Sequence, residues 1–361
     1  MINALSLFSG MGGDTLGIEQ TGINVVAFNE FDKTAINTHL NNFKNCKLLG
    51  NDKTDKHDIL KISDSTFQEY KNEVDLIFAG FPCQGFSHGG KKLPSDPRNT
   101  LFREFIRAAK LIKPKYIIGE NVDGLLSRKT DSGENFIDVI VSEFENIGYN
   151  ITYKVCHVVQ YGVPQLRKRL IIVGIRNDLN KTYVFPEPEN NGKTNLPNLQ
   201  NIVQFNMKGA IQIDKEDFDM STIPSECILT DMNNDETEDT TNIHPYLRLK
   251  AKTRNETYND TVHYNLLSFA KRGSPIHAEI IDIRKPSKTI ICSYDHQPRL
   301  FVPLQNKNGY FIRCLLPDEL KQIQGFPADF EVLGVLKQKI KQIGNAVPPP
   351  LIKKIVNQLI S

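Results

Sequence analysis

Short apolar runs alternate with amphipathic segments through the first half of the chain. The runs are rich in β-branched and aromatic residues, and the segments between them repeat their apolar positions every three or four residues. Strands alternating with helices predict βαβ units, and therefore a doubly wound α/β domain around a mostly parallel sheet. The predicted strands are Ala4–Phe8, Ile23–Phe28, Val74–Ala79, Tyr116–Gly119, Thr152–Val159 and Leu170–Ile175, and the predicted helices are Lys33–Phe43, Leu101–Ile112 and Asn135–Ile147.

The pattern changes after Phe185, where a segment rich in proline and asparagine begins and the periodicity weakens. Regular patterning resumes at Glu279–Ser293 and in a final predicted helix, Pro350–Ile360. We therefore expect a first domain formed by residues 1–185 and 336–361, interrupted by a smaller and less regular domain at residues 186–335.

Charge is distributed unevenly over the 361 residues, although the formal net charge is only +2. Residues 186–282 contain 16 acidic and 9 basic residues, a net charge of −7, so the remainder carries +9. Within that insert, residues 186–239 are strongly acidic, and we interpret the run Asp231–Asp239 as a solvated loop. The contrast predicts a polyanionic partner on one side of the molecule.

Targeting and cysteine patterns exclude several classes of protein. No run of 18 apolar residues occurs, and residues 1–5 have no basic segment or cleavage site, so we expect a cytoplasmic protein without membrane contact. The six cysteines form no C-x-x-C pair. This argues against a disulfide framework and against a structural zinc site.

A glycine-rich turn follows the first predicted strand. Gly10, Gly12 and Gly13 let the backbone turn sharply and approach a ligand closely. Glu30 ends the second predicted strand, where a carboxylate can accept hydrogen bonds from ribose hydroxyls. The pattern favours a nucleoside cofactor, while an ordinary βα turn or an NAD site would look similar.

Cys83 and Glu120 follow two further predicted strands. Cys83 comes after Pro82 in a loop at the carboxyl end of a strand, where open α/β sheets bind ligands. A lone cysteine is more often a small buried hydrophobe, and Glu120 alone reads more readily as an acid capping a helix. Together, a cysteine and an acid suggest covalent catalysis on a ring that needs protonation.

Eight blocks of sequence, in order, are similar to those of the DNA cytosine-5 methyltransferase family, of the prokaryotic restriction-modification type. The resemblance spans nearly the whole chain and implies a Rossmann-like methyltransferase fold. The blocks are Leu7–Gly13, Asn29–Asp32, His57–Ile59, Gly80–Gln84, Glu120–Val122, Gln165–Arg169, Arg284–Ile290 and Gln342–Pro348.

The resemblance implies that the cofactor is S-adenosylmethionine and that no metal is used. Two positions depart from the family's pattern: Ser6 stands where an acid is common, and His57 replaces a glycine. The implied cofactor residues are Phe8, Gly10, Gly12, Glu30, Phe31, Asp58, Ile59, Pro82, Asn345 and Ala346.

The resemblance also implies the roles of four catalytic residues. The Cys83 thiolate would add to C6 of cytosine, which activates C5 toward the sulfonium methyl group. Glu120 would hydrogen-bond N3 and the exocyclic amino group. Arg169, with Arg167 in support, would hold the O2 carbonyl oxygen. The cytosine would first have to leave the helical stack.

The expected partner is double-stranded DNA. Residues 84–99 have the composition of a mobile lid, and residues 186–283 fall where the family places its target-recognition region. An extended segment at 247–254 would either grip phosphates or form a solvated edge strand protected by its charges; we weigh the two equally. The candidate DNA contacts are Gln84, Ser87, Lys91, Lys92, Arg98, Arg248, Lys250, Lys252, Arg254, Lys271 and Arg272.

Three rival functions remain. A tRNA cytosine-5 methyltransferase would share the catalytic blocks, but its Cys-Phe-Thr tripeptide is missing from this sequence. A non-catalytic DNA-binding relative would not need the four catalytic residues. An NAD-dependent oxidoreductase would leave most blocks unexplained. We expect a monomer that acts separately from any cognate restriction endonuclease, and an orphan role is equally compatible.

Overall fold

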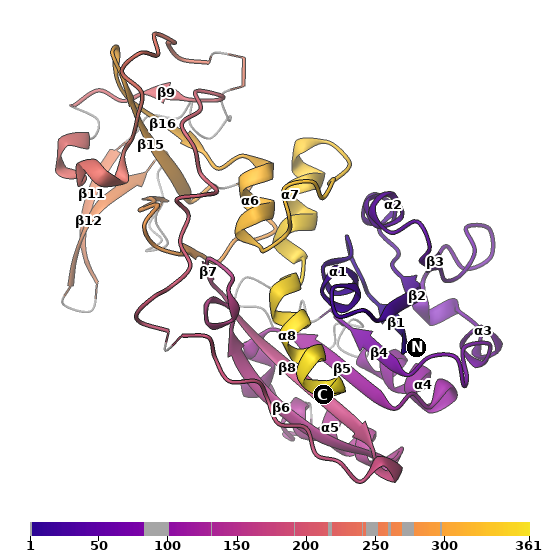
Figure 1. The fold of residues 1–361 in the computed structure, drawn as a ribbon. Coiled ribbons are helices and arrows are strands. Elements are labelled where there is room, and N and C mark those ends of the chain that lie inside the picture. Colours follow the sequence, from indigo (N-terminus) through magenta and orange to yellow (C-terminus); the bar gives the residue numbers. More distant parts are fainter. Residues whose placement is uncertain are drawn as a thin grey trace.

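The computed structural model contains two seven-stranded sheets joined by a short connecting sheet (Figure 1). Its described residues are 2–82, 101–130, 132–190, 192–215, 219–239, 241–242, 252–258, 261–268, 278–296 and 298–361.

The first sheet has the strand order β3-β2-β1-β4-β5-β8-β6. Its first five strands are parallel, whereas β8 runs antiparallel to both β5 and β6. The mostly parallel sheet and all six predicted strands are therefore confirmed. The strands are β1 (Asn3–Leu7), β2 (Asn24–Asn29), β3 (Lys47–Leu48), β4 (Leu76–Ala79), β5 (Tyr116–Asn121), β6 (Tyr149–His157) and β8 (Lys168–Arg176).

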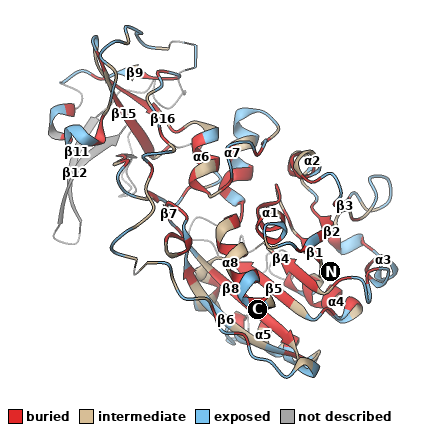
Figure 2. Ribbon diagram, in the orientation of Figure 1, coloured by how far each residue is buried: buried red, intermediate tan, exposed pale blue. Residues whose placement is uncertain are grey.

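Helices cover both faces of this sheet because its strands are apolar on both sides. In β1, Ala4 packs into the core beneath α1, α2 and α8, while Leu5 and Leu7 pack into the core beneath α3, α4 and α5. The central strands are buried throughout (Figure 2). The helices are α1 (Gly13–Glu19), α2 (Lys33–Asn42), α3 (Asp64–Gln68), α4 (Phe102–Ile112), α5 (Phe136–Asn146) and α8 (Pro349–Ile360).

The second sheet has the order β11-β12-β13-β15-β16-β9, with β10 beside β15. We expected a less regular domain here and did not predict this sheet. One side of it continues the core of the first domain through Leu300 and Val302. Its strands are β9 (Ile211–Gln212), β10 (Leu229–Thr230), β11 (Lys252–Tyr258), β12 (Thr261–Ser268), β13 (Ala278–Ile280), β15 (Leu300–Asn306) and β16 (Gly309–Cys314).

The chain returns from the second sheet to the first through one strand pair and two helices. Strand β7 (Gln165–Leu166) pairs with β14 (Ser287–Lys288), and helices α6 (Pro317–Ile323) and α7 (Leu336–Asn345) precede α8. Contacts with α2 begin before the domain boundary that we expected at residue 336: the backbone N–H of Leu333 donates to Thr38 Oγ1 over 3.0 Å. Within the described residues, no helix has the length and apolar character needed to cross a membrane.

Candidate active site

The site lies at the edge of the first sheet where the parallel strands end. The carboxyl ends of β1, β2, β4 and β5 share this edge, and the antiparallel strand β8 begins there. Open α/β sheets bind ligands at such an edge. The strand directions therefore bring together loops that are far apart in the sequence.

Glu120 and Arg169 form a buried ion pair at this edge. Glu120 lies in β5, and Arg169 lies at the start of the neighbouring strand β8, one diagonal position along. The Arg169 Nε to Glu120 Oε1 distance is 2.6 Å, and the two side chains are only 14% and 11% exposed. Burial lowers the pKa of the Arg169 guanidinium, and the Glu120 carboxylate opposes that shift. The helix-capping role that we considered for Glu120 is wrong, because Glu120 belongs to a strand.

The loop after β4 is held against the same strand. Asn121 Nδ2 donates to the carbonyl oxygen of Phe81 over 3.1 Å, and the Asn121 side chain also accepts from the N–H of Val122. Phe81 is buried, and Pro82 follows it. Gly80 lies beside Glu120, since a Cβ placed there would be 3.8 Å from Glu120 Oε2. The residue that follows Pro82 is Cys83, which lies outside the described residues.

Glu30 is buried and holds the glycine-rich turn by a hydrogen bond. Its carboxylate accepts the backbone N–H of Gly10 at 3.0 Å and those of Phe31 and Asp32 at 2.8 Å each. Burial raises the pKa of this carboxyl, and the three N–H donors oppose the shift. A Cβ placed on Gly10 would meet nothing within 4 Å, so the space above the turn is open.

Phe31, Asp58 and Ile59 lie in the loops that follow β2 and β3. The Phe31 ring is 71% exposed, which suits an aromatic surface that stacks on a flat ligand. Asp58 caps a short 3₁₀ helix that begins at the buried Ile59. His57, where we noted a missing glycine, has φ 59° and so keeps the left-handed conformation that glycine favours.

The C-terminal segment, from α7 to α8, packs against the glycine-rich turn and α1. A Cβ on Gly13 would collide with the carbonyl oxygen of Val347, and α8 packs against α1. Helix α7 ends at Asn345, and Ala346 is buried. Lys341 of α7 also pairs with Asp32 over 2.8 Å. Residues from both ends of the chain therefore pack together at the glycine-rich turn.

Comparison with known families identifies the family to which the chain belongs. Residues 2–361 match the family model of the C-5 cytosine-specific DNA methylases. The chain belongs to this family. The family resemblance that we inferred from eight sequence blocks is confirmed.

Named relatives of the methylase are similar over nearly all of the chain. The Type II methyltransferase M.Eco47II of Escherichia coli is 33% identical over 95% of this chain and 75% of its own length. M.FnuDI of Fusobacterium nucleatum is 32% identical over 96% of this chain and 91% of its own length. Among solved structures, the S. pombe Dnmt2 methyltransferase has a TM-score of 0.63 and 14% identity, covering 100% of this chain and 98% of its own. This last likeness confirms the fold.

The Arg167 side chain is buried against the C-terminal segment of the methylase. Its fully buried guanidinium donates to the carbonyl oxygens of Ile290 at 3.1 Å, Gly344 at 3.2 Å and Ala346 at 3.4 Å. Burial and the nearby Arg169 lower the pKa of this guanidinium well below its usual range. Through these three carbonyls, Arg167 ties the C-terminal segment to the segment that follows β14. We predicted Arg167 in support of Arg169, and these hydrogen bonds give Arg167 a positioning role in the core.

Replacing Arg167 with methionine should destabilise the methylase by about 2–4 kcal/mol, because three buried carbonyl groups lose their donor. Urea unfolding measures this loss. Arg103→Met is the matched control, since the Arg103 side chain is 59% exposed in a long ion pair with Glu143; it should cost less than about 1 kcal/mol. Equal losses in the two variants would contradict the role assigned to Arg167.

Nine of the eleven candidate DNA contacts lie outside the described residues. The other two, Lys252 and Arg254, lie in strand β11, and their contact with DNA stays a prediction. The acidic run Asp231–Asp239 packs against the β15–β16 hairpin, where Asn306 Nδ2 donates to Asn234 and Glu236. The candidates outside the described residues are Gln84, Ser87, Lys91, Lys92, Arg98, Arg248, Lys250, Lys271 and Arg272.

Sequence reasoning missed a groove beside the active site. It has a volume of about 380 Å³ and lies next to Leu166, three residues from Arg169. Lys288 and Arg299 contribute cationic side chains, whereas the hydroxyls of Thr289 and Tyr294 already donate to the carbonyl oxygens of Leu166 and Leu300. Cationic side chains in a groove are typical of contacts to a phosphate backbone. The pairing of β7 with β14, which the sequence pattern does not predict, creates it.

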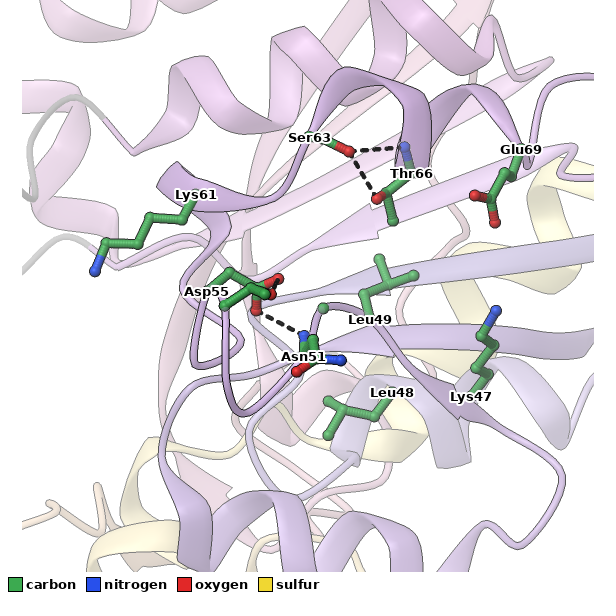
Figure 3. Close-up of a pocket in the computed structure, with 11 residues that line it drawn as sticks. Lys47, Leu48, Leu49, Asn51, Asp55, Lys61, Ser63, Thr66 and Glu69 are labelled. Atoms are coloured by element: carbon green, nitrogen blue, oxygen red, sulfur yellow. Dashed lines mark hydrogen bonds between the residues drawn. The ribbon is translucent and has the colours of Figure 1, made fainter.

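A second pocket, of about 470 Å³, lies between the edge strand β3 and helix α3 (Figure 3). Several of its polar side chains hold the local backbone: Asp55 accepts the N–H of Asn51, and Ser63 accepts the N–H of Thr66 and so caps α3. The expected cofactor residues do not line it. The predicted cofactor site is therefore not this pocket but the carboxyl edge of the sheet.

Proposed function

We propose that this protein transfers a methyl group from S-adenosylmethionine to C5 of a cytosine in double-stranded DNA, at a specific sequence. One observation carries the proposal. The Glu120–Arg169 ion pair lies at the sheet edge beside the strand end that leads to Cys83, in a chain whose family model covers residues 2–361. The relatives named Type II methyltransferases support a restriction-modification role.

The residues around the glycine-rich turn fit S-adenosylmethionine. The cofactor supplies an electrophilic methyl group on a sulfonium. Gly10 leaves open space for it, Glu30 can accept hydrogen bonds from ribose hydroxyls while holding the turn, and the exposed Phe31 ring can stack on the adenine. Asp58, Ile59, Pro82, Asn345 and Ala346 complete the proposed pocket, with Phe8 and Gly12 shaping the turn.

The catalytic residues act on the cytosine ring. Cytosine C5 is a poor nucleophile, so the Cys83 thiolate first forms a bond to C6 and places an enamine in the ring. Glu120 holds a proton at N3 and accepts from the exocyclic amino group, while Arg169 donates to O2. After C5 has been methylated, loss of the C5 proton and departure of the Cys83 thiolate restore the aromatic ring.

The shape of a duplex requires the cytosine to leave the stack before this chemistry. Glu120 and Arg169 are both buried, so a base still paired in a helix cannot reach them. Residues 84–99 are the proposed lid over the displaced base, and residues 186–283 are the proposed target-recognition region. We further propose a monomer that acts in the cytoplasm, separately from any cognate endonuclease.

Bisulfite sequencing tests the proposed function directly. Purified protein should convert cytosines in unmethylated plasmid DNA into bisulfite-resistant 5-methylcytosines when S-adenosylmethionine is present, and these should fall within one short sequence motif. The same reaction with S-adenosylhomocysteine is the control. Plasmid without new 5-methylcytosine would refute the proposal. Methylation of tRNA alone would favour the tRNA enzyme.

A further inference from the structure

Asp14 lies buried beneath the glycine-rich turn, at the start of α1. Only 1% of the residue is exposed. Ser6 Oγ, from β1, donates to one carboxylate oxygen, and Ser9 Oγ, from the turn itself, donates to the other over 3.2 Å. A single carboxylate therefore ties the strand, the turn and the helix together.

A chain of polar side chains continues from this carboxylate into an otherwise apolar core. Ser9 Oγ lies 3.3 Å from Thr15 Oγ1, which lies 3.0 Å from His39 Nε2. His39 is fully buried and stacks on Phe28 with 3.6 Å between ring centroids. Burial lowers the pKa of His39 to about 3, so the ring is neutral at physiological pH. Buried polar groups are costly unless they are hydrogen-bonded, and within the described residues this chain satisfies that condition except at His39 Nδ1, which has no partner.

The turn above this chain has an unusual backbone. Phe8, Gly10 and Gly12 all have positive φ angles of 57°, 56° and 93°. A Cβ on Gly12 would lie 2.9 Å from His39, so the turn rests directly on the buried chain. For Phe8, which is not a glycine, this conformation is unfavourable and persists only when its surroundings enforce it.

Two carboxylates hold the turn from opposite sides. Glu30 accepts the N–H of Gly10 on the side of the proposed cofactor pocket. Asp14 accepts the hydroxyl of Ser9 on the side of the core. The backbone of the turn adds two bonds of its own: the N–H of Ser9 donates to Asn29, and that of Gly12 donates to Ser9.

We propose that Asp14 is a positioning residue for S-adenosylmethionine: with Ser6 as its partner, it holds the glycine-rich turn in the conformation that binds the cofactor. This inference rests on the proposed function for the identity of the ligand. It assigns Asp14 no contact with the cofactor and no part in the chemistry.

The charge state of Asp14 is compatible with this role. Burial raises its pKa to about 6, while the hydrogen bonds from Ser6 and Ser9 oppose the shift. At pH 7.5 the carboxyl is therefore ionised and accepts both hydroxyl groups.

Exchanging the residue types of Ser6 and Asp14 tests the positioning role of Asp14. Asp14→Ser removes the carboxylate and should weaken S-adenosylmethionine binding about tenfold or more, since hydrogen bonds to charged groups are the strong ones. Ser6→Asp alone places two carboxylates in contact and should weaken binding to a similar extent. The double variant S6D/D14S restores one carboxylate and one hydroxyl, and binding should return to within about threefold of the wild type.

Isothermal titration calorimetry on the full chain measures these affinities at pH 7.5, and turnover at saturating cofactor is measured alongside. We expect the variants to change affinity more than turnover, because Asp14 acts on the turn and not on the base. Thr21→Ala is the matched control: it removes one side-chain hydrogen bond, to Ile18, at the far end of the same helix. Its cofactor affinity should equal that of the wild type.

Ser9→Ala keeps the test decisive if Asp14→Ser does not fold. It removes the hydrogen bond between turn and carboxylate, together with the longer contact to Thr15 Oγ1, and should weaken binding about threefold to tenfold. Wild-type affinity in Asp14→Ser or Ser9→Ala, or no recovery in S6D/D14S, would overturn the inference. A wild-type protein that does not bind S-adenosylmethionine would instead refute the proposed function.

Discussion

Cys83→Ala is expected to reduce DNA methylation to background while leaving the affinities for S-adenosylmethionine and DNA within about twofold of the wild type. The reason is chemical: without the thiolate, C6 of cytosine forms no covalent bond, and C5 stays part of an aromatic ring. Binding should persist because all the proposed cofactor residues except Pro82 lie in other loops, and because Asn121 holds the backbone of Phe81 whatever residue stands at position 83. Transfer of a radiolabelled methyl group measures the activity.

A covalent trapping experiment distinguishes a catalytic nucleophile from a cysteine that has only a structural role. In DNA that carries 5-fluorocytosine, C5 has no proton to lose, so the bond between the thiolate and C6 should persist through denaturing electrophoresis. The wild type and Cys292→Ala should both form this adduct, because Cys292 is an exposed thiol outside the proposed chemistry. An adduct in Cys83→Ala, or methylation within about tenfold of the wild type, would contradict the assignment.

Periodicity predicted the first domain because each of its strands and helices has a continuous pattern of its own. The predicted helix Lys33–Phe43, for example, appears as α2 with nearly the same ends. The second sheet was missed although one local pattern was available. Strands β15 and β16 are joined by a two-residue turn, with Asn306 paired to Gly309, and such a turn between apolar runs is typical of a hairpin.

The resemblance did not reveal that Arg169 pairs with Glu120 while Arg167 points into the core, and the reason is local. In one continuous strand, residues 167 and 169 would face the same side. Strand β7 ends at Leu166 and β8 begins at Lys168, and between them the N–H of Arg167 bonds to the carbonyl of Gln165. This break in the strand turns Arg167 into the core. No pattern of residue types reveals it.

Asp14 shows a different limit of sequence reasoning. Ser6 and Asp14 are eight positions apart, and neither stands out by composition or spacing. Their contact exists because the turn folds α1 back over the end of β1. We noted Ser6 as a departure from the family's pattern, but only the structure shows a carboxylate beside it.

Glu120→Gln is expected to lower kcat about 10²–10³-fold, with little change in the affinity for S-adenosylmethionine. Glutamine keeps the size of the side chain, and its oxygen can still accept from Arg169 Nε, so the local structure should survive. What is lost is the group that holds a proton at N3 of the cytosine. The free energy of unfolding should fall by about 1–3 kcal/mol, since Arg169 loses its buried counter-charge.

Glu104→Gln provides the matched control for this variant. Glu104 pairs with Arg107 over 2.6 Å on α4, and its side chain is 16% exposed, so both ion pairs are short and largely buried. The control should lose stability and keep kcat, whereas Glu120→Gln should lose both. Single-turnover kinetics at saturating cofactor and DNA separate the chemical step from binding. If Glu120→Gln kept kcat within about tenfold of the control, Glu120 would serve only to hold Arg169, and the proton at N3 would need another source.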